Sequence, residues 1–69
     1  MNTIGVTING EPRRVPGPGS LLTLLEHLGL DPRTVVVELN REIVRRPHLG
    51  KTGVAEGDAI ELVHFVGGG

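Results

Sequence analysis

Apolar and polar residues alternate at the start of the chain, and this pattern predicts a β-hairpin. Every second position within residues 3–8 is apolar, which gives a strand one apolar face. Asn9-Gly10 follows directly, and both residues tolerate the positive φ angles of a type I′ turn. We therefore expect residues 11–15 to return antiparallel to the first strand, with Pro12 marking the return strand as an edge strand.

The spacing of four leucines predicts one helix after this hairpin. Residues 16–19 read Pro-Gly-Pro-Gly, which favours neither a strand nor a helix. Ser20 then offers a hydroxyl group to the free amides of a helix that begins at the next residue. The leucines at helical spacing are Leu21, Leu24, Leu25 and Leu28. Gly29 is expected to end the helix, because glycine readily adopts the left-handed conformation found there.

The second half of the chain predicts three more strands. Residues 34–40 are rich in valine and alternate with period two, so we expect an interior strand. A tight connection at residues 41–42 leads to a short strand at 43–44. A polar excursion follows, in which Leu49 and Val54 are the expected apolar anchors. The last strand is expected to extend from residue 59 to residue 66.

This order of elements predicts an α+β fold in which a mixed sheet of four to five strands packs on one helix. The last strand is expected near the middle of the sheet, with its end projecting from the folded body. We interpret the pattern as a β-grasp, or ubiquitin-like, roll. It comprises a domain at residues 1–66 and a flexible tail at residues 67–69.

Size and composition exclude several classes of function. A chain of 69 residues has no room for separate nucleotide- and substrate-binding halves, which favours a protein partner over a catalyst. The formal net charge is −1, and the basic residues form no stripe that could follow a phosphate backbone, so nucleic acid is not expected as a ligand. Cysteine is absent, which excludes disulfides and thiol catalysis. The three histidines lack the paired spacing of a metal site, and no metal is expected.

The amino-terminal residues indicate neither a secretion signal nor a membrane anchor. Residues 1–8 contain no basic region followed by an apolar run. No segment of the chain approaches the roughly 18 apolar residues of a membrane span. We therefore expect a soluble cytoplasmic protein.

Three glycines at the end of the sequence, Gly67, Gly68 and Gly69, are the strongest candidate for a functional group. Such an end can be a frayed terminus or an expression remnant. However, the glycines follow a strongly patterned strand without a polar spacer, and glycine backbone can enter channels too narrow for any side chain. Three extended residues reach about 10 Å, far enough to carry the Gly69 carboxylate into another protein's active site. The tail is therefore interpreted as a probe.

A carboxylate is a poor acyl donor and must first be activated, for example as an acyl-adenylate. The sequence contains neither a Gly-x-x-x-x-Gly-Lys-Ser/Thr loop nor an acidic pair placed for Mg²⁺. An activating partner is therefore expected, and ATP and Mg²⁺ are expected to bind that partner and not this chain.

Two segments resemble the ThiS sulfur carriers of thiamin biosynthesis. They are Val-Val-Val-Glu-Leu-Asn-Arg-Glu-Ile-Val at residues 35–44 and Gly-Asp-Ala-Ile-Glu-Leu-Val-His-Phe-Val-Gly-Gly-Gly at residues 57–69. The resemblance implies a β-grasp protein whose Gly69 carboxylate is adenylated by a ubiquitin-activating-like adenylyltransferase of the ThiF type. It further implies conversion to a thiocarboxylate, with sulfur from a donor such as a cysteine desulfurase, and delivery to a thiazole synthase of the ThiG type. The chain is then a protein co-substrate and not an enzyme.

Alternation in the last strand suggests where such partners dock. If Ile60 and Leu62 face the core, Val63 and Phe65 face the opposite side, beside the root of the tail. We interpret these two residues, together with Val66, as a docking surface. The competing interpretation is that the strand twists and Phe65 packs locally.

Three alternatives to the thiamin pathway remain open at this point. The same tail chemistry serves a carrier for molybdopterin or cysteine biosynthesis. A ubiquitin-like modifier would instead be joined to lysines, although Lys51 is the sole lysine and offers one site for building chains on itself. The last alternative is an interaction domain with an inert tail.

Overall fold

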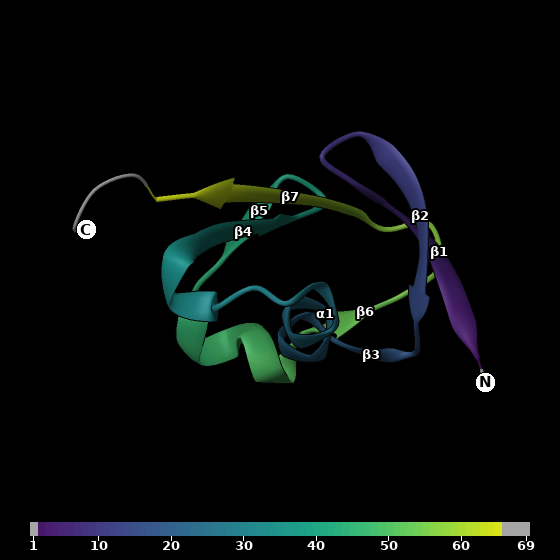
Figure 1. Cartoon of the computed structure of the whole chain (residues 1–69), viewed down its shortest axis with the longest axis horizontal. Coiled ribbons are helices and arrows are strands. Elements are labelled where there is room, and N and C mark those ends of the chain that lie inside the picture. Colours follow the sequence, from purple (N-terminus) through teal and green to yellow (C-terminus); the bar gives the residue numbers. More distant parts are fainter. Residues whose placement is uncertain (1, 66–69) are drawn as a thin grey trace.

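The computed structural model describes residues 2–65, which form a five-stranded sheet with one α-helix packed against it (Figure 1). Helix α1 (Leu21–Leu28) lies on one side of the sheet, together with the short strands β3 (Gly19–Ser20) and β6 (Gly53–Val54). The opposite side, which we call the outer face, is not covered by any element of residues 2–65.

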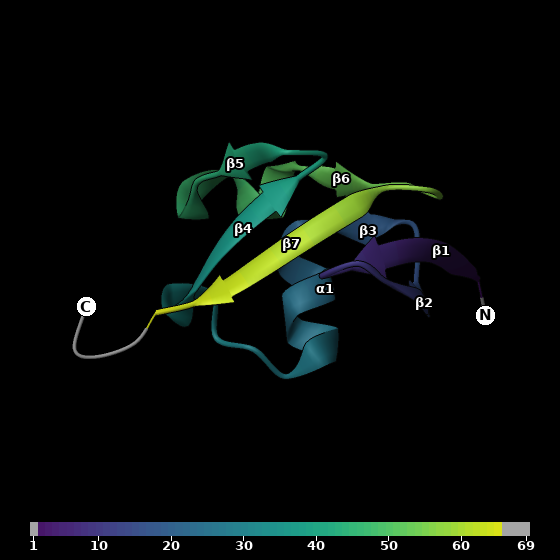
Figure 2. The same cartoon turned by 90° about the horizontal axis from the view of Figure 1, so that it is seen from above.

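The sheet is mixed, and its central strand is the last one in the sequence. The strands are β1 (Thr3–Ile8), β2 (Glu11–Pro16), β4 (Val35–Leu39), β5 (Glu42–Val44) and β7 (Ala59–His64). Their spatial order is β2-β1-β7-β4-β5, with β7 parallel to β1 and antiparallel to β4 (Figure 2). The predicted mixed sheet, the edge position of β2 and the central position of the last strand are confirmed.

In each of the two hairpins of the sheet, a turn with left-handed backbone joins the two strands. Asn9 and Gly10 have φ angles of 51° and 83°, which confirms the predicted turn between β1 and β2. Asn40 and Arg41 have φ angles of 51° and 73° and join β4 to β5. The connection predicted at residues 41–42 is therefore one residue too late, because Glu42 already pairs with β4.

The predicted strand at residues 34–40 is also too long at both ends. Thr34 belongs to the 3₁₀ helix η1 (Pro32–Thr34), and Asn40 belongs to the turn. The 3₁₀ helix forms because the Asp31 side chain accepts a bond from the Arg33 N–H and proline occupies the first helical position.

Both ends of α1 are stabilised as the sequence predicts. The Ser20 hydroxyl oxygen accepts from the Thr23 N–H at 3.1 Å, and the Thr23 hydroxyl oxygen accepts from the Ser20 N–H at 2.9 Å. This reciprocal pair satisfies two amides at the helix start. Gly29 ends the helix with a φ of 75°. Leu28 is only partly buried, whereas the other three leucines of the stripe belong to the core.

Residues 16–19 were predicted to favour neither a strand nor a helix, and this prediction is wrong for the two residues at its ends. Pro16 is the last residue of β2, and Gly19 pairs with Val54 in the two-stranded ladder of β3 and β6. The sequence could not reveal this ladder, because it depends on pairing with residues more than thirty positions away.

The core lies between the sheet and α1 and contains only apolar side chains among residues 2–65. Leu49, in the 3₁₀ helix η2 (Arg46–Lys51), and Val54 are both buried, which confirms them as anchors. The buried residues are Val6, Ile8, Val15, Leu21, Leu24, Leu25, Val35, Val37, Leu49, Val54, Ile60 and Leu62.

Candidate functional site

The central strand leads to the position from which the glycine segment departs. The strand predicted to reach residue 66 ends at His64, so Phe65 lies outside β7. The Phe65 N–H nevertheless donates to the Thr34 carbonyl oxygen at 2.9 Å, which extends the pairing with the β4 side by one bond. The backbone at Phe65 is thus held to the folded body.

The other predicted site residues lie outside the described residues. They are Val66, Gly67, Gly68 and Gly69. The predicted boundary between domain and tail falls in the same segment. Both the tail and its boundary therefore stay predictions.

Alternation in β7 places apolar side chains on the outer face, as predicted. Ile60 and Leu62 are buried, whereas the side chains of Val63 and Phe65 are 58% and 54% exposed. Phe65 is therefore not packed into the core.

Ile43 is a further exposed apolar residue on this face, and the sequence analysis missed it. It is 64% exposed and lies opposite Glu38 on the neighbouring strand, with its side chain on the same face as Glu38. The signal was available, because alternation within residues 34–40 places Glu38 on the face opposite Val35 and Val37, and antiparallel pairing places Ile43 beside it.

We call Val36, Ile43, Val63 and Phe65 the outer-face patch. Val36 and Val63 are register partners on β4 and β7, so their side chains lie side by side. Glu38 and Glu61 are the next register pair on the same face of these two strands and border the patch with negative charge. Exposed apolar side chains that lie together on an uncovered face are typical of a protein-binding surface.

Two asparagine side chains fix β7 from opposite sides. The Asn9 Oδ1 accepts from the Leu62 N–H at 2.7 Å, and its Nδ2 donates to the Leu62 carbonyl at 3.2 Å. The Asn40 Oδ1 accepts from the Ala59 N–H at 2.9 Å, and its Nδ2 donates to the Asp58 carboxylate at 3.1 Å. The turn of each hairpin therefore also positions β7, the strand that leads to the tail.

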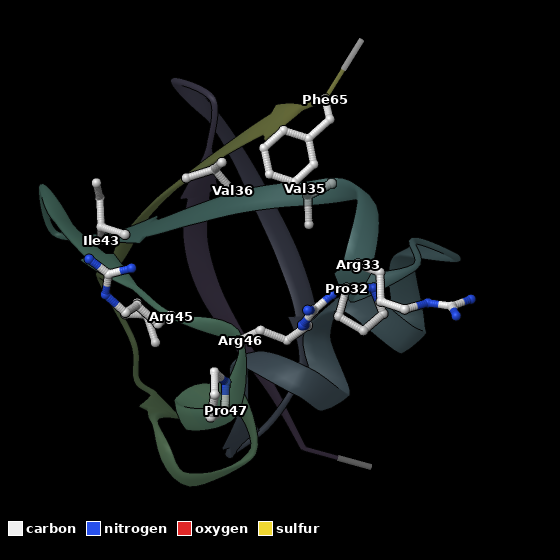
Figure 3. Close-up of a pocket in the computed structure, with 10 residues that line it drawn as sticks. Pro32, Arg33, Val35, Val36, Ile43, Arg45, Arg46, Pro47 and Phe65 are labelled. Carbon is white, nitrogen blue, oxygen red and sulfur yellow. The ribbon is translucent and has the colours of Figure 1, made fainter. Parts of the chain in front are cut away.

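A groove of about 510 Å³ lies beside the root of the tail (Figure 3). One side is formed by the end of β5 and the start of η2, and the other by η1 and Phe65, with the first residues of β4 between them. We call it the root groove. Its lining residues are Pro32, Arg33, Val35, Val36, Ile43, Val44, Arg45, Arg46, Pro47 and Phe65.

Arginines give the root groove its charge. The Arg33 guanidinium forms a two-pronged contact with the Asp31 carboxylate, with distances of 2.8 Å and 3.1 Å. These hydrogen bonds, followed by the backbone bond from Arg33 and by smaller contributions from the charges of Arg33 and Arg46, lower the pKa of Asp31 from 3.8 to about 2. Within residues 2–65, no carboxylate lies within ion-pair distance of Arg45 or Arg46.

Metal-binding side chains do not converge in the described part of the chain. His27, His48 and His64 lie on α1, η2 and β7, and all three are exposed. Residues 2–65 contain no group of three or more His, Cys, Asp or Glu side chains placed to hold a metal ion. Among the same residues, no helix is long and apolar enough to span a membrane.

Known proteins resemble this chain over nearly its full length. The sequence model of the ThiS family matches residues 6–69. The sulfur carrier protein ThiS of Bacillus subtilis is 39% identical over 51 residues, which are 74% of this chain and 77% of that protein. A crystal structure of a thiamine biosynthesis protein (ThiS) from Geobacter metallireducens aligns with a TM-score of 0.83 and 38% identity, covering 96% of this chain and all of that one. This likeness confirms the predicted β-grasp fold.

Part of a longer protein matches as well. A thiazole synthase from Paramagnetospirillum magneticum is 42% identical over 64 residues, which are 93% of this chain but 20% of the synthase. The chain thus spans about a fifth of the length of the thiazole synthases that it matches.

Proposed function

Because the chain belongs to the ThiS family, we propose that it is the sulfur carrier that supplies sulfur for the thiazole ring of thiamin. The observation that supports this proposal best is the position of Phe65. A central strand, bonded on both sides, ends beside an uncovered apolar patch, and the next four residues of the sequence are Val66 and the three glycines. This arrangement suits a rigid body that presents a narrow chain end to another protein.

In the proposed reaction, the Gly69 carboxylate is a substrate. One of its oxygens attacks the α-phosphate of ATP, pyrophosphate leaves, and an acyl-adenylate forms. The terminal sulfur of a persulfide on a donor such as a cysteine desulfurase then displaces AMP and forms an acyl disulfide. A thiol reductant cleaves the S–S bond, and the product is a thiocarboxylate. ATP and Mg²⁺ are held by the ubiquitin-activating-like adenylyltransferase in this proposal, and the chain contributes only the reacting carboxylate.

The partner must bind the folded body beside the tail, because an acyl group reacts efficiently only when it is held in position. We assign this docking role to the outer-face patch, in particular to Val63 and Phe65, and to Val66, the next residue of the sequence. The match of the chain to part of a thiazole synthase supports a synthase of this kind as the acceptor. The proposal places these encounters in the cytoplasm.

Intact-mass spectrometry of the protein isolated from its own host tests the proposal. Replacement of one oxygen by sulfur adds about 16 mass units, and this gain is expected in a fraction of the molecules. The same gain is expected in vitro with the adenylyltransferase, ATP, Mg²⁺, the sulfur donor and a thiol reductant, and it should disappear when ATP is omitted. Ladders of covalent conjugates in the host would instead identify a protein modifier, and an unchanged mass in both settings would refute sulfur carriage.

The acceptor is tested separately from the loading reaction. Thiocarboxylate protein is added to thiazole synthase with its other substrates, and sulfur transfer to the thiazole product is measured. Transfer of sulfur to a molybdopterin precursor or to a cysteine precursor, with none to thiazole, would keep the carrier chemistry but replace the pathway.

A further inference from the structure

We propose that the root groove binds an acidic segment of the protein that activates the tail, with two carboxylates on Arg45 and Arg46 and an apolar side chain between them. This inference rests on the proposed function for the identity of the partner. It adds a second, charged contact site to the apolar docking at Val63 and Phe65.

In the described part of the chain, Arg45 and Arg46 form no ion pair and can bind a partner. Both are exposed, and no carboxylate of residues 2–65 lies within 4.0 Å of either guanidinium. Arg33 also lines the groove, but its guanidinium is paired with Asp31 and extends away from Arg45 and Arg46 (Figure 3). Arg46 instead extends across the groove toward Pro32. Guanidinium groups bind carboxylates in a two-pronged geometry that an ammonium group cannot reproduce.

Apart from its three arginines, the groove lining is apolar and suits a hydrophobic side chain. Among its other residues are Val35, Val36 and Val44, which belong to β4 and β5. Phe65 and Ile43 line the groove and also belong to the outer-face patch. A partner segment in the groove would therefore be continuous with the interface that we propose for the patch. Burying the two charges beside this apolar lining strengthens their pairing with a carboxylate.

A nucleotide phosphate is a poorer fit to the same arginines. Four residues span at most about 13 Å when fully extended, a reach that allows Gly69 to react inside the partner's active site, away from the folded body. Arg45 and Arg46 lie on the folded body and line the same groove as Phe65, four residues before Gly69 in the sequence. Charges in this place contribute to the encounter and orientation of the partner, and not to the phosphate chemistry.

The first arm of the test uses a short acidic peptide as probe. The ¹⁵N-labelled chain is titrated with an acetylated, amidated Asp-Glu-Leu-Asp-Glu peptide, and backbone amide shifts are followed by NMR. Shifts are expected at Arg45, Arg46 and Phe65, and the Asn-Gln-Leu-Asn-Gln peptide is expected to bind about tenfold more weakly. The Arg45→Ala/Arg46→Ala variant should lose about tenfold in affinity.

A matched variant separates specific binding from a general charge effect. Arg13→Ala/Lys51→Ala removes the same two positive charges from exposed positions outside the groove and should bind the acidic peptide within about twofold of the unmodified chain. Equal losses in the two double variants, or shifts centred elsewhere, overturn the proposal. A chain shortened after Phe65 completes this arm. If only the shortened chain binds the peptide, the groove is occupied by the chain's own tail and the proposal is wrong.

The second arm uses the adenylyltransferase itself. The association rate of Arg45→Ala/Arg46→Ala should fall about tenfold at low salt and depend less steeply on salt than that of the unmodified chain. Normal sulfur loading, association and salt dependence in this variant would overturn the inference and leave the proposed function standing. Absence of loading in the unmodified chain, with groove-specific peptide binding, would instead refute the proposed function while the groove remains an acidic-peptide site.

Discussion

Replacing Asn9 with glycine measures how strongly one side chain holds the central strand. Asn9 makes two bonds to the backbone of Leu62, at 2.7 Å and 3.2 Å, and Leu62 is itself 8% exposed. Glycine removes both bonds but keeps the backbone free to adopt the φ of 51°. The substitution therefore isolates the side chain from the conformational preference of the turn.

The expected loss is about 2 kcal/mol in the free energy of unfolding. An intramolecular hydrogen bond contributes about 1 kcal/mol net, and a buried N–H left without a partner costs about 1–3 kcal/mol. Relative to a total stability on the order of 5 kcal/mol for a chain of this size, the loss is large. It corresponds to a fall of about 8–16 °C in melting temperature.

Urea unfolding followed by far-UV circular dichroism is the appropriate measurement, because the chain contains no Trp or Tyr for fluorescence. Asn40→Gly is the matched control: Asn40 has the same φ of 51° and also makes two bonds beside the start of β7, but in an exposed setting. We expect it to lose about half as much. Asn9→Asp should fall between asparagine and glycine, since it retains only the acceptor. If Asn9→Gly unfolds at the same urea concentration as the unmodified chain, the side chain does not hold β7.

The remaining predictions concern the site and its surroundings. Phe65→Ala should lower stability by less than about 1 kcal/mol, because the side chain is 54% exposed, but weaken adenylyltransferase binding; a large fall in melting temperature with normal binding would assign Phe65 to the core. Deleting Gly69 should leave the urea midpoint unchanged and abolish sulfur loading, measured by intact mass, and unchanged loading would contradict the mechanism. Asp31 has a folded-state pKa of about 2, below its usual 3.8, so the unfolded chain binds the proton more tightly. Its stabilising contribution is therefore complete above pH 3.8 and lost as the pH falls toward 2; Asp31→Asn should flatten this part of the urea-midpoint curve, and an unchanged curve would show that the Asp31–Arg33 contact is not maintained in solution.

Local sequence signals were sufficient wherever a residue's conformation depends on its immediate neighbours. The turn at Asn9-Gly10 and the caps at Ser20 and Gly29 depend on backbone angles and hydrogen bonds within a few positions, and all three were predicted correctly. The exposed apolar side of β7 was also predictable, because strict alternation separates Val63 from Leu62.

Features that depend on distant pairing were not predictable in this way. Gly19 forms a strand only because Val54 lies beside it, and Asn9 is bonded to a residue 53 positions away. The root groove has the same origin: Arg46 and Phe65 are separated by 19 positions and meet only through the sheet. Pairs of arginines on a chain with nearly balanced charge carry no local signal that would indicate a groove.

The central position of β7 also determines the order in which the fold can be completed. Without this strand, β1 and β2 form one hairpin and β4 and β5 form another, and no sheet bond joins the two. During synthesis the two hairpins therefore cannot join into one sheet until residues 59–64 have been made. The contacts that β7 forms with β1 and β4 are long-range and slow to form. The segment that carries the tail is thus also the segment that closes the sheet. A molecule in which β7 is paired with both β1 and β4 has therefore joined its two hairpins before it meets a partner.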